Sequence, residues 1–403
     1  MDLKNKRIAI VADWFIDFGW AELVISHLLE IYPEADIYTS VCYMDHPMLE
    51  GRTVYTSWIQ KIPFLNRRHK LAGILRPFAF RSFDLSGYDV ILCSSSAESK
   101  QVAMGKWNQE LYTRKPKVFV YCHTPTRYYW SHAKEYEDMM EFGWMNPLVK
   151  LVFRLMKWWM QKVDYAAAQR VDHFIANSEN TRERIQKYYD RQSTVIYPGI
   201  EILRHCEERS NPDFWKQGID WDIESHRNST SPRNGKNNTE YYLGLGRCIP
   251  YKKFDLLVEA FNANGKRLIL CTSTDTPLFR ELKSRSKPNI EWKFSISNDD
   301  KNILMANAAV FLFPPEEDFG LVPVEAMMMW TPVIAYRKWG TLETIIEWES
   351  GIFFSPQTPE ALNQAIEKFE KREWNRGKIQ EHAGKFSKEN FQKNILQFIE
   401  DHA

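Results

Sequence analysis

The sequence lacks an excess of one charge, an apolar run long enough to cross a bilayer, and a metal-binding set of cysteines. Its 403 residues carry 53 basic and 52 acidic side chains, a net charge of +1. No field of the whole protein would therefore attract nucleic acid, and any anion must be bound by a local site. Hydrophobic residues still make up 44% of the chain, and its length favours two domains over one.

The cysteines show no C-x-x-C pair or other spacing typical of metal ligands. Several stand inside apolar runs, which indicates buried, reduced thiols in a cytoplasmic protein. No signal peptide is expected, because the first six residues lead directly into a predicted strand. The protein is therefore expected to be soluble or, at most, peripheral to a membrane. The six cysteines are Cys42, Cys93, Cys122, Cys206, Cys248 and Cys271.

Short apolar runs alternate with helical patterns over most of the chain, and this alternation predicts parallel sheets with helices on both faces. Two such series imply an α/β protein of two doubly wound, Rossmann-like domains. In such folds ligands bind beyond the carboxyl ends of the strands, here where the two domains would face each other. The predicted strands include Arg7–Ala12, Asp36–Val41, Val90–Ser94, Val118–Cys122, His173–Ala176, Val195–Tyr197, Tyr241–Gly244, Arg267–Cys271, Val310–Phe313 and Val333–Ala335.

A polar segment without periodicity interrupts the alternation and predicts an insertion between domains at residues 199–239. The first domain is then expected over residues 1–198 and the second over residues 240–385. Residues 386–403 are expected to form a closing helix.

The strongest motif runs from Pro314 to Met327, where an apolar strand ends in a turn rich in carboxylates. A helix is expected to begin near Pro323, and the N–H groups of its start would suit a diphosphate. Glu325 in the first turn and Glu317 before it could accept hydrogen bonds from sugar hydroxyls. Acidic residues near a helix start are equally typical of ordinary capping.

A second motif, from Gly244 to Lys253, places Arg247 and Lys252 in a glycine-containing loop between a strand and a helix. Two cations there could neutralise a diphosphate leaving group, which is the main electrostatic demand of glycosyl transfer. A solvated basic loop is the alternative. The acidic turn that follows later in the same predicted domain makes the pair of motifs more specific than either alone.

Gly246-Arg247 with Lys252, followed by Glu317-x7-Glu325, resembles the nucleotide-sugar glycosyltransferases of family 4, a retaining family with the GT-B fold. The likeness continues in Val120–Tyr128, Phe174–Ser178 and Val195–Pro198 and covers nearly the whole chain outside the insertion. The sequence of the acidic motif is similar to that found in the branch of mannosyltransferases that build O-antigen and capsule polysaccharides.

The resemblance implies a role for each matching residue. Arg247 and Lys252 would hold the donor diphosphate, Glu325 the ribose hydroxyls and Glu317 the donor sugar near the reacting centre. Main-chain N–H groups would contact the sugar and phosphate; they belong to Phe319, Gly320 and Leu321.

In the first domain, His123 matches a family histidine that contacts the donor sugar, although a histidine at a strand end is often structural. The loop at Gly19 and Trp20 matches the family's acceptor or phosphate loop. The family likeness also implies that the closing helix returns to the first domain.

The reaction implied is transfer of a hexose, mannose from GDP-mannose, with retention onto a glycan, in the favoured version a lipid-linked one. Such enzymes need no metal or other cofactor beside the nucleotide sugar. The alternatives are the same fold with a UDP-sugar donor and a non-catalytic sugar-nucleotide-binding homologue.

Four tryptophans stand where the family has glycine: Trp20, Trp330, Trp339 and Trp348. Tryptophan meets neither need that glycine serves, a positive φ or a close backbone approach. One cause would explain all four, a UGA codon that the cell reads as glycine. The 17 glycines, roughly 4% against the usual ~7%, beside 15 tryptophans fit this hypothesis. A further departure, Thr272–Pro277, replaces a glycine-rich turn that would contact the base.

Residues 148–163 carry four cations among apolar and aromatic side chains and no acid: Lys150, Arg154, Lys157 and Lys162. Such a helix could lie on an anionic membrane at the inner face of the cell membrane. A helix packed on the domain with a solvated basic face is the alternative. A second basic patch is expected at Arg67, Arg68, Lys70 and Arg76.

Overall fold

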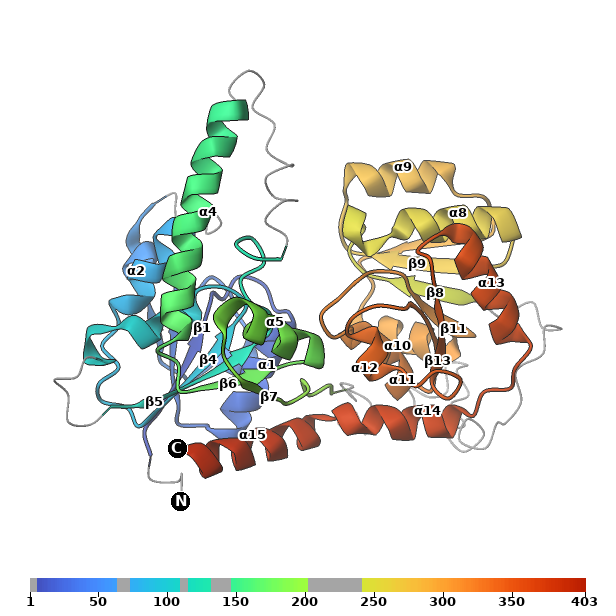
Figure 1. Ribbon diagram of the computed structural model, residues 1–403. Coiled ribbons are helices and arrows are strands. Elements are labelled where there is room, and N and C mark those ends of the chain that lie inside the picture. The colour runs from blue at the N-terminus through green and yellow to red at the C-terminus, as the bar shows by residue number, and fades with distance from the viewer. Residues whose placement is uncertain (1–5, 64–72, 109–114, 132–145, 202–240) are drawn as a thin grey trace. The chain divides into compact units, whose positions relative to one another are not determined.

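The computed structural model describes residues 6–63, 73–108, 115–131, 146–201 and 241–403 (Figure 1). Contacts divide the chain into two compact units. Unit 1 comprises Met1–Gly199 with Lys388–Ala403, and unit 2 comprises Ile200–Ser387. Most of the predicted insertion at 199–239 lies outside the described residues, as do Cys206, Arg67, Arg68 and Lys70.

Unit 1 contains a parallel sheet of seven strands in the order β3-β2-β1-β4-β5-β6-β7. Helices cover both of its faces, as the alternation predicts. The strands are β1 Ile8–Ala12, β2 Asp36–Thr39, β3 Val54–Thr56, β4 Val90–Ser95, β5 Lys117–Cys122, β6 His173–Ala176 and β7 Ser193–Val195. The α-helices are α1 Trp20–Ile31, α2 Arg76–Arg81, α4 Asn146–Ala168, α5 Glu179–Tyr189 and α15 Lys388–His402; short 3-10 helices include η2 Pro47–Leu49, η3 Trp58–Lys61, η5 Ser99–Met104 and η6 Lys106–Asn108.

Alternate residues of the strands in unit 1 serve two cores, because successive side chains of a strand point to opposite faces. On β1, Ile8 and Ile10 belong to a core shared with α1 and α15. Ala9 and Val11 belong to the other core, which includes residues of α2, η5 and α5. Strand β1 is therefore apolar throughout and was predictable as a buried run. The closing helix, expected over residues 386–403, is observed as Lys388–His402 and packs against α1.

Unit 2 contains a parallel sheet of six strands in the order β10-β9-β8-β11-β12-β13. The strands are β8 Tyr242–Leu245, β9 Leu268–Thr272, β10 Ile290–Phe294, β11 Val310–Phe313, β12 Val333–Tyr336 and β13 Gly351–Phe354. The helices are η9 Pro250–Lys252, α8 Phe254–Asn264, α9 Pro277–Arg285, α10 Asn298–Asn307, α11 Leu321–Met328, α12 Thr341–Thr344, α13 Pro359–Glu370, α14 Arg376–Ala383 and η10 Gly384–Phe386. Both units therefore have the doubly wound strand order expected of Rossmann-like domains.

Three of the four tryptophans at family glycine positions have a left-handed backbone. Their φ angles are +60° at Trp330, +55° at Trp339 and +68° at Trp348. Trp20 differs, because it is the first residue of α1 and its φ is not positive. The expectation of a positive φ is thus met at three sites and not at the fourth.

Candidate functional site

The two sequence motifs meet where the strand order of unit 2 reverses. The strand order reverses between β8 and β11, and in doubly wound folds ligands bind beyond the carboxyl ends of the strands at such a point. The loop after β8 carries Arg247 and Lys252, and the loop after β11 carries Glu317. The fold therefore brings together segments that are 65 residues apart in sequence.

Lys252 and Glu317 form a direct ion pair, Nζ to Oε1. Their side chains are only 13% and 20% exposed, so the pair is shielded more than a surface salt bridge. Lys252 is the last residue of η9, and two threonines, one at the end of β9 and one before α9, hold Cys248 two residues before η9. Thr272 Oγ1 accepts a hydrogen bond from the Cys248 N–H at 3.1 Å, and Thr276 Oγ1 donates to the Cys248 carbonyl at 2.7 Å. The departure at Thr272–Pro277 thus anchors the cationic loop.

Gly340 holds the acidic turn in place. Its N–H donates to the Glu317 carbonyl at 3.1 Å. A Cβ at this position would lie 2.3 Å from Phe319 Cα, so a larger residue would displace the turn. Phe319 itself is buried, with its ring 5.5 Å from that of Phe386. Its predicted contribution to donor binding can therefore come from its main chain and not from its ring.

Helix α11 begins at Leu321, two residues before the expected start near Pro323. Gly320 is its N-cap, with φ +81°. A positive φ at this point is readily adopted by glycine, which explains why the helix can start there. Because Pro323 has no N–H, the N–H groups at the helix start belong to residues around Leu321. Glu325 is therefore the fifth residue of α11 and lies beyond its first turn, contrary to the prediction.

Glu325 is paired with Lys301 of α10, whose Nζ lies 2.8 Å from Glu325 Oε1. Burial raises the pKa of Glu325, and the Lys301 ammonium partly offsets this effect. Lys301 was missed by the sequence reasoning. It stands in an ordinary polar helix start, and nothing in its neighbourhood distinguishes it from a solvated lysine.

Arg247 is exposed, and its guanidinium donates to the Tyr251 hydroxyl at 3.0 Å. Arg247 lies in the same loop as Lys252. Its described hydrogen bond is to Tyr251, and none is described to Glu317 or Glu325.

His123 follows β5 at the carboxyl edge of the sheet in unit 1. Its Nε2 lies 2.8 Å from Ser94 Oγ, at the end of the neighbouring strand. Burial, with a smaller effect of Arg127, lowers the pKa of His123 to about 4. The imidazole is therefore neutral near pH 7 and can either donate or accept a hydrogen bond. Ser94 is a second residue that the sequence reasoning missed.

Gly19 and Trp20 form the start of α1, in the loop region after β1. The Gly19 N–H donates to Glu22 Oε2 at 3.0 Å, so the carboxylate caps its own helix. Trp20 is 37% exposed. No hydrogen bond or ion pair described for Gly19 or Trp20 involves His123.

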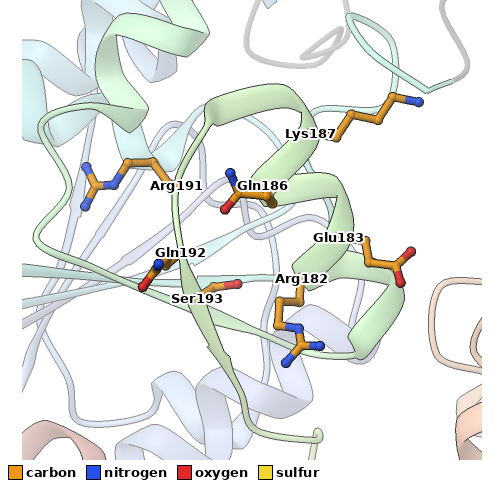
Figure 2. A pocket seen from close by; sticks show the side chains of 7 residues that line it. All are labelled: Arg182, Glu183, Gln186, Lys187, Arg191, Gln192 and Ser193. Carbon is orange, nitrogen blue, oxygen red and sulfur yellow. The ribbon is translucent and has the colours of Figure 1, made fainter.

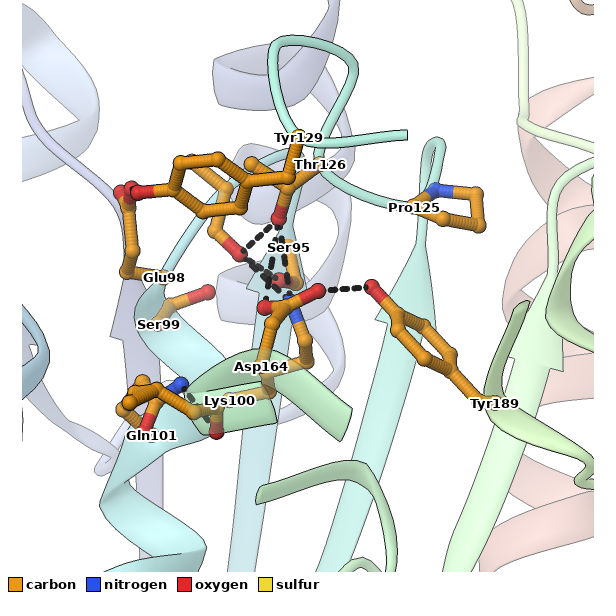
Figure 3. A network of polar contacts seen from close by, with 12 residues as sticks. Ser95, Glu98, Ser99, Lys100, Gln101, Pro125, Thr126, Tyr129, Asp164 and Tyr189 are labelled. Carbon is orange, nitrogen blue, oxygen red and sulfur yellow. Dashed lines mark hydrogen bonds and ion pairs between the residues drawn. The ribbon is translucent and has the colours of Figure 1, made fainter. Parts of the chain in front are cut away.

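A buried polar network supports the loops after β4 and β5 (Figure 3). Lys100 Nζ lies 2.6 Å from Asp164 Oδ1 and also donates to Thr126 Oγ1 at 3.2 Å. Glu98 forms a second buried pair with Arg76, 2.8 Å from Arg76 Nε to Glu98 Oε2. The expected basic surface patch is therefore wrong at Arg76, whose side chain is 4% exposed and pairs with an internal carboxylate.

A hollow on α5 and β7 is lined by cations but involves none of the predicted residues (Figure 2). Its cations have other partners. Arg182 pairs with Glu179 at 2.6 Å, and Arg191 donates to carbonyls at the end of α4 and beyond it, those of Ala168 and Val171 among them. The Arg182–Glu179 pair lies on the surface of α5, whereas Arg191 ties the segment before β7 to the end of α4, so these contacts explain the cations without a ligand.

Within the described ranges, no group of three or more His, Cys, Asp or Glu side chains is placed to hold a metal ion. Metal independence stays a prediction. None of the helices described combines the length and apolar character required for a membrane span. Of the cysteines in the described residues, all are free; Cys93, Cys122, Cys248 and Cys271 are buried, whereas Cys42 is only partly so.

Two family models match the chain in succession. One is described as Glycosyltransferase Family 4 and matches residues 21–204, and the other as Glycosyl transferases group 1 and matches residues 226–390. Together they span most of the sequence and divide close to the boundary between the two units.

The chain is similar to curated proteins named α-1,3/1,6-mannosyltransferase ALG2. It is 25% identical to the Mus musculus protein over 71% of this chain and 66% of that one. It is 23% identical to the Dictyostelium discoideum protein over 61% of this chain and 60% of that one. The chain thus spans about 60 to 66% of the length of these relatives.

Solved structures share the fold. Anabaena Alr3699/HepE, crystallised with UDP and glucose, superposes with a TM-score of 0.64 over 98% of this chain and 100% of that chain. At 19% identity this likeness shows the GT-B architecture alone.

Proposed function

Because the chain belongs to the family 4 glycosyltransferases with the GT-B fold, we propose that it transfers mannose from GDP-mannose, with retention, onto a lipid-linked glycan. The names of the curated relatives support mannose as the sugar. Placement in the O-antigen and capsule branch, cytoplasmic location and independence of metal are parts of the same proposal.

The Lys252–Glu317 pair is the observation that carries the proposal. A nucleotide-sugar site needs a cation for the diphosphate and an acceptor of hydrogen bonds for the sugar, side by side. The pair supplies both at the strand-order reversal of unit 2, where this fold class binds nucleotides. Glu325 lies on the helix that follows the same turn and is assigned to the ribose hydroxyls.

Donor binding would exchange the partner of Lys252. The diphosphate takes the place of the Glu317 carboxylate beside the ammonium, which leaves Glu317 to accept hydrogen bonds from the sugar. The bond between the anomeric carbon and the phosphate oxygen then breaks, and the acceptor oxygen bonds to the same face of that carbon. The acceptor proton passes to the departing diphosphate, so charge does not accumulate on the acceptor.

A thermal-shift and calorimetric screen with GDP-mannose, UDP-glucose and ADP-glucose tests the donor. Selective binding of GDP-mannose, followed by transfer with an α product from the α donor in NMR, is expected. Selective binding of UDP-glucose would replace the donor assignment. Binding without transfer to any lipid-linked acceptor would favour the alternative, a non-catalytic homologue.

Lys252→Met tests the diphosphate contact against Lys266→Met, which removes a lysine paired with Glu370 elsewhere in unit 2. A hydrogen bond to a charged group contributes about 1.5–3 kcal/mol, so Lys252→Met should weaken GDP binding about 10- to 100-fold. The Lys266 variant should bind GDP as the unaltered protein does. Equal affinities in both variants would exclude Lys252 from the site.

Glu317→Gln separates sugar binding from diphosphate binding. Loss of the carboxylate frees Lys252, so GDP should bind at least as tightly as before. Transfer should fall sharply, because the contact to the reacting sugar is weakened. A variant with full transfer activity would remove Glu317 from the mechanism.

A further inference from the structure

Helix α4 carries a face of exposed aromatic and apolar side chains. The α4 aromatic face consists of Leu155, Trp158 and Trp159, together with Phe78 of α2. These side chains are 61%, 55%, 36% and 45% exposed, respectively. The rings of Trp159 and Phe78 stack with centroids 6.1 Å apart, and Figure 1 shows α2 beside α4. Single exposed apolar residues are normal, but a joined group of this size marks a binding surface.

Cations lie among these aromatic side chains. Lys162 Nζ lies 3.8 Å from the centre of the Trp158 ring, and Arg154 is exposed on the same helix one turn before Trp158. The sequence from residue 146 to residue 163 contains no aspartate or glutamate. The charge on this face is therefore of one sign, although the whole chain is nearly neutral.

The opposite side of α4 is buried in unit 1. Met160 and Asp164 are 1% exposed, and Asp164 pairs with Lys100 beneath the helix. The helix is thus anchored through one side and presents the other outward.

We infer that the α4 aromatic face docks on an anionic lipid surface. Tryptophan is typical of the membrane–water interface, and lysine and arginine near it are attracted by anionic headgroups. Protein interfaces, in contrast, are depleted of lysine at their centres. The docking itself does not depend on the proposed function. Only its purpose, to bring the enzyme to a lipid-linked acceptor, rests on that function.

Flotation with vesicles tests the docking without any donor or acceptor. Vesicles of phosphatidylcholine alone are compared with vesicles in which phosphatidylglycerol makes up about a third of the lipid. The protein should float with the anionic vesicles and not with the neutral ones, and high salt should release part of it because headgroup charges are screened.

Two paired substitutions separate the apolar and charged contributions. Leu155→Ser with Trp158→Ser should reduce bound protein at least tenfold. Arg154→Gln with Lys162→Gln should abolish the preference for anionic vesicles. A matched control, Arg182→Gln with Lys187→Gln on α5, removes the same charge and should float normally. Circular dichroism and melting midpoints confirm that each variant is folded.

The lipid assignment would be overturned if the unaltered protein failed to float. It would also be overturned if both α4 variants floated as well as the unaltered protein. Equal loss in the α5 control would show non-specific charge attraction and would also overturn it. Flotation without transferase activity would leave the docking intact and reject the proposed function.

A different observation, the left-handed backbone at Trp330, Trp339 and Trp348, concerns the chemical identity of these residues. Within the part of the chain that the structure describes, six residues other than glycine have positive φ, and three of them are tryptophan. A side chain in this conformation brings Cβ close to the following carbonyl oxygen. Asparagine, aspartate and glycine tolerate such positions far better than tryptophan.

The surroundings agree with glycine. Trp330 follows α11 after its C-cap, Met329, a position where helices very often carry glycine. Its indole N–H is buried and has no hydrogen-bond partner among the described residues. Trp374, in contrast, donates to the Phe369 carbonyl at 3.2 Å and stacks on that ring. We infer that positions 330, 339 and 348 are glycine in the cell and that position 374 is tryptophan.

The gene sequence and mass spectrometry of the protein from its own cells test this directly. UGA codons at the three positions, with glycine masses in the corresponding peptides, are expected, whereas Trp374 should have UGG. UGG at the three positions, or UGA codons with tryptophan masses, would overturn the inference. Neither result depends on transferase activity.

Discussion

Asp164 is one partner of a buried ion pair, and the cost of replacing it by asparagine follows from its contacts. Its Oδ1 faces Lys100 Nζ at 2.6 Å, and both side chains are at most 2% exposed. Oδ2 accepts hydrogen bonds from Tyr189 and Trp130 at 2.7 and 2.9 Å. Asparagine keeps an acceptor for these two donors but removes the charge opposite Lys100.

Burial alone would lower the pKa of Lys100, but Asp164 raises it above the ordinary value of a lysine. In Asp164→Asn the ammonium keeps its bonds to Ala97 and Thr126 but loses its counter-charge. Breaking a buried pair in this way costs about 3–5 kcal/mol. For a unit of this size each kcal/mol shifts the midpoint by about 2–4 °C, so a fall of about 6–20 °C is expected.

Differential scanning calorimetry measures the shift, with Glu179→Gln as the control, because that carboxylate pairs with Arg182 at 2.6 Å on the surface. The control should melt nearly as the unaltered protein does. Adding Lys100→Met to Asp164→Asn removes the buried charge and should recover most of the loss. A midpoint for Asp164→Asn equal to that of the control, or no recovery in the double variant, would refute the reasoning.

Three further predictions concern other parts of the chain. Lys301→Met should weaken GDP binding several-fold. It should also leave Glu325 protonated to higher pH, because burial raises the pKa of Glu325 and the variant lacks the Lys301 ammonium that offsets this effect. Calorimetry at two pH values checks both effects. His123 has a pKa of about 4 in the folded protein, so stability should fall as pH drops below about 6.5, where the unfolded chain takes up the proton first; urea titrations of His123→Gln should show a smaller loss between pH 7 and pH 4.5. In protein produced with tryptophan at position 348, Trp348→Gly should raise the melting midpoint, since a left-handed non-glycine residue costs about 1–2 kcal/mol and the side chain is 40% exposed. Trp374→Gly, which removes a buried ring, should lower the midpoint.

The central strands were predictable because parallel strands covered on both faces are continuous apolar runs. The limits of β6 and β11 match the prediction at both ends, and β1, β4 and β5 differ from it by one residue. The meeting of the two motifs could also be foreseen, since the carboxyl ends of parallel strands share one edge of a sheet.

The errors gather at the sheet edges. Strands β3, β10 and β13 were not predicted, and β7 was placed two residues too late. All four are edge strands of their sheets. An edge strand has one side open to solvent, and β3, β7 and β10 accordingly mix polar with apolar residues, whereas β13 is apolar and was missed without this reason. A pattern of apolar runs alone cannot find such mixed strands.

The sequence by itself determined the order of the elements, the division into two domains of alternating strands and helices, and the identity of the motif residues. These features depend on local composition and spacing. The choice of charge partners was decided by the tertiary structure. Lys252 with Glu317, Lys301 with Glu325 and Lys100 with Asp164 join segments 24 to 65 residues apart. Which cation meets which carboxylate depends on where strands end in space, and spacing along the chain does not contain that information.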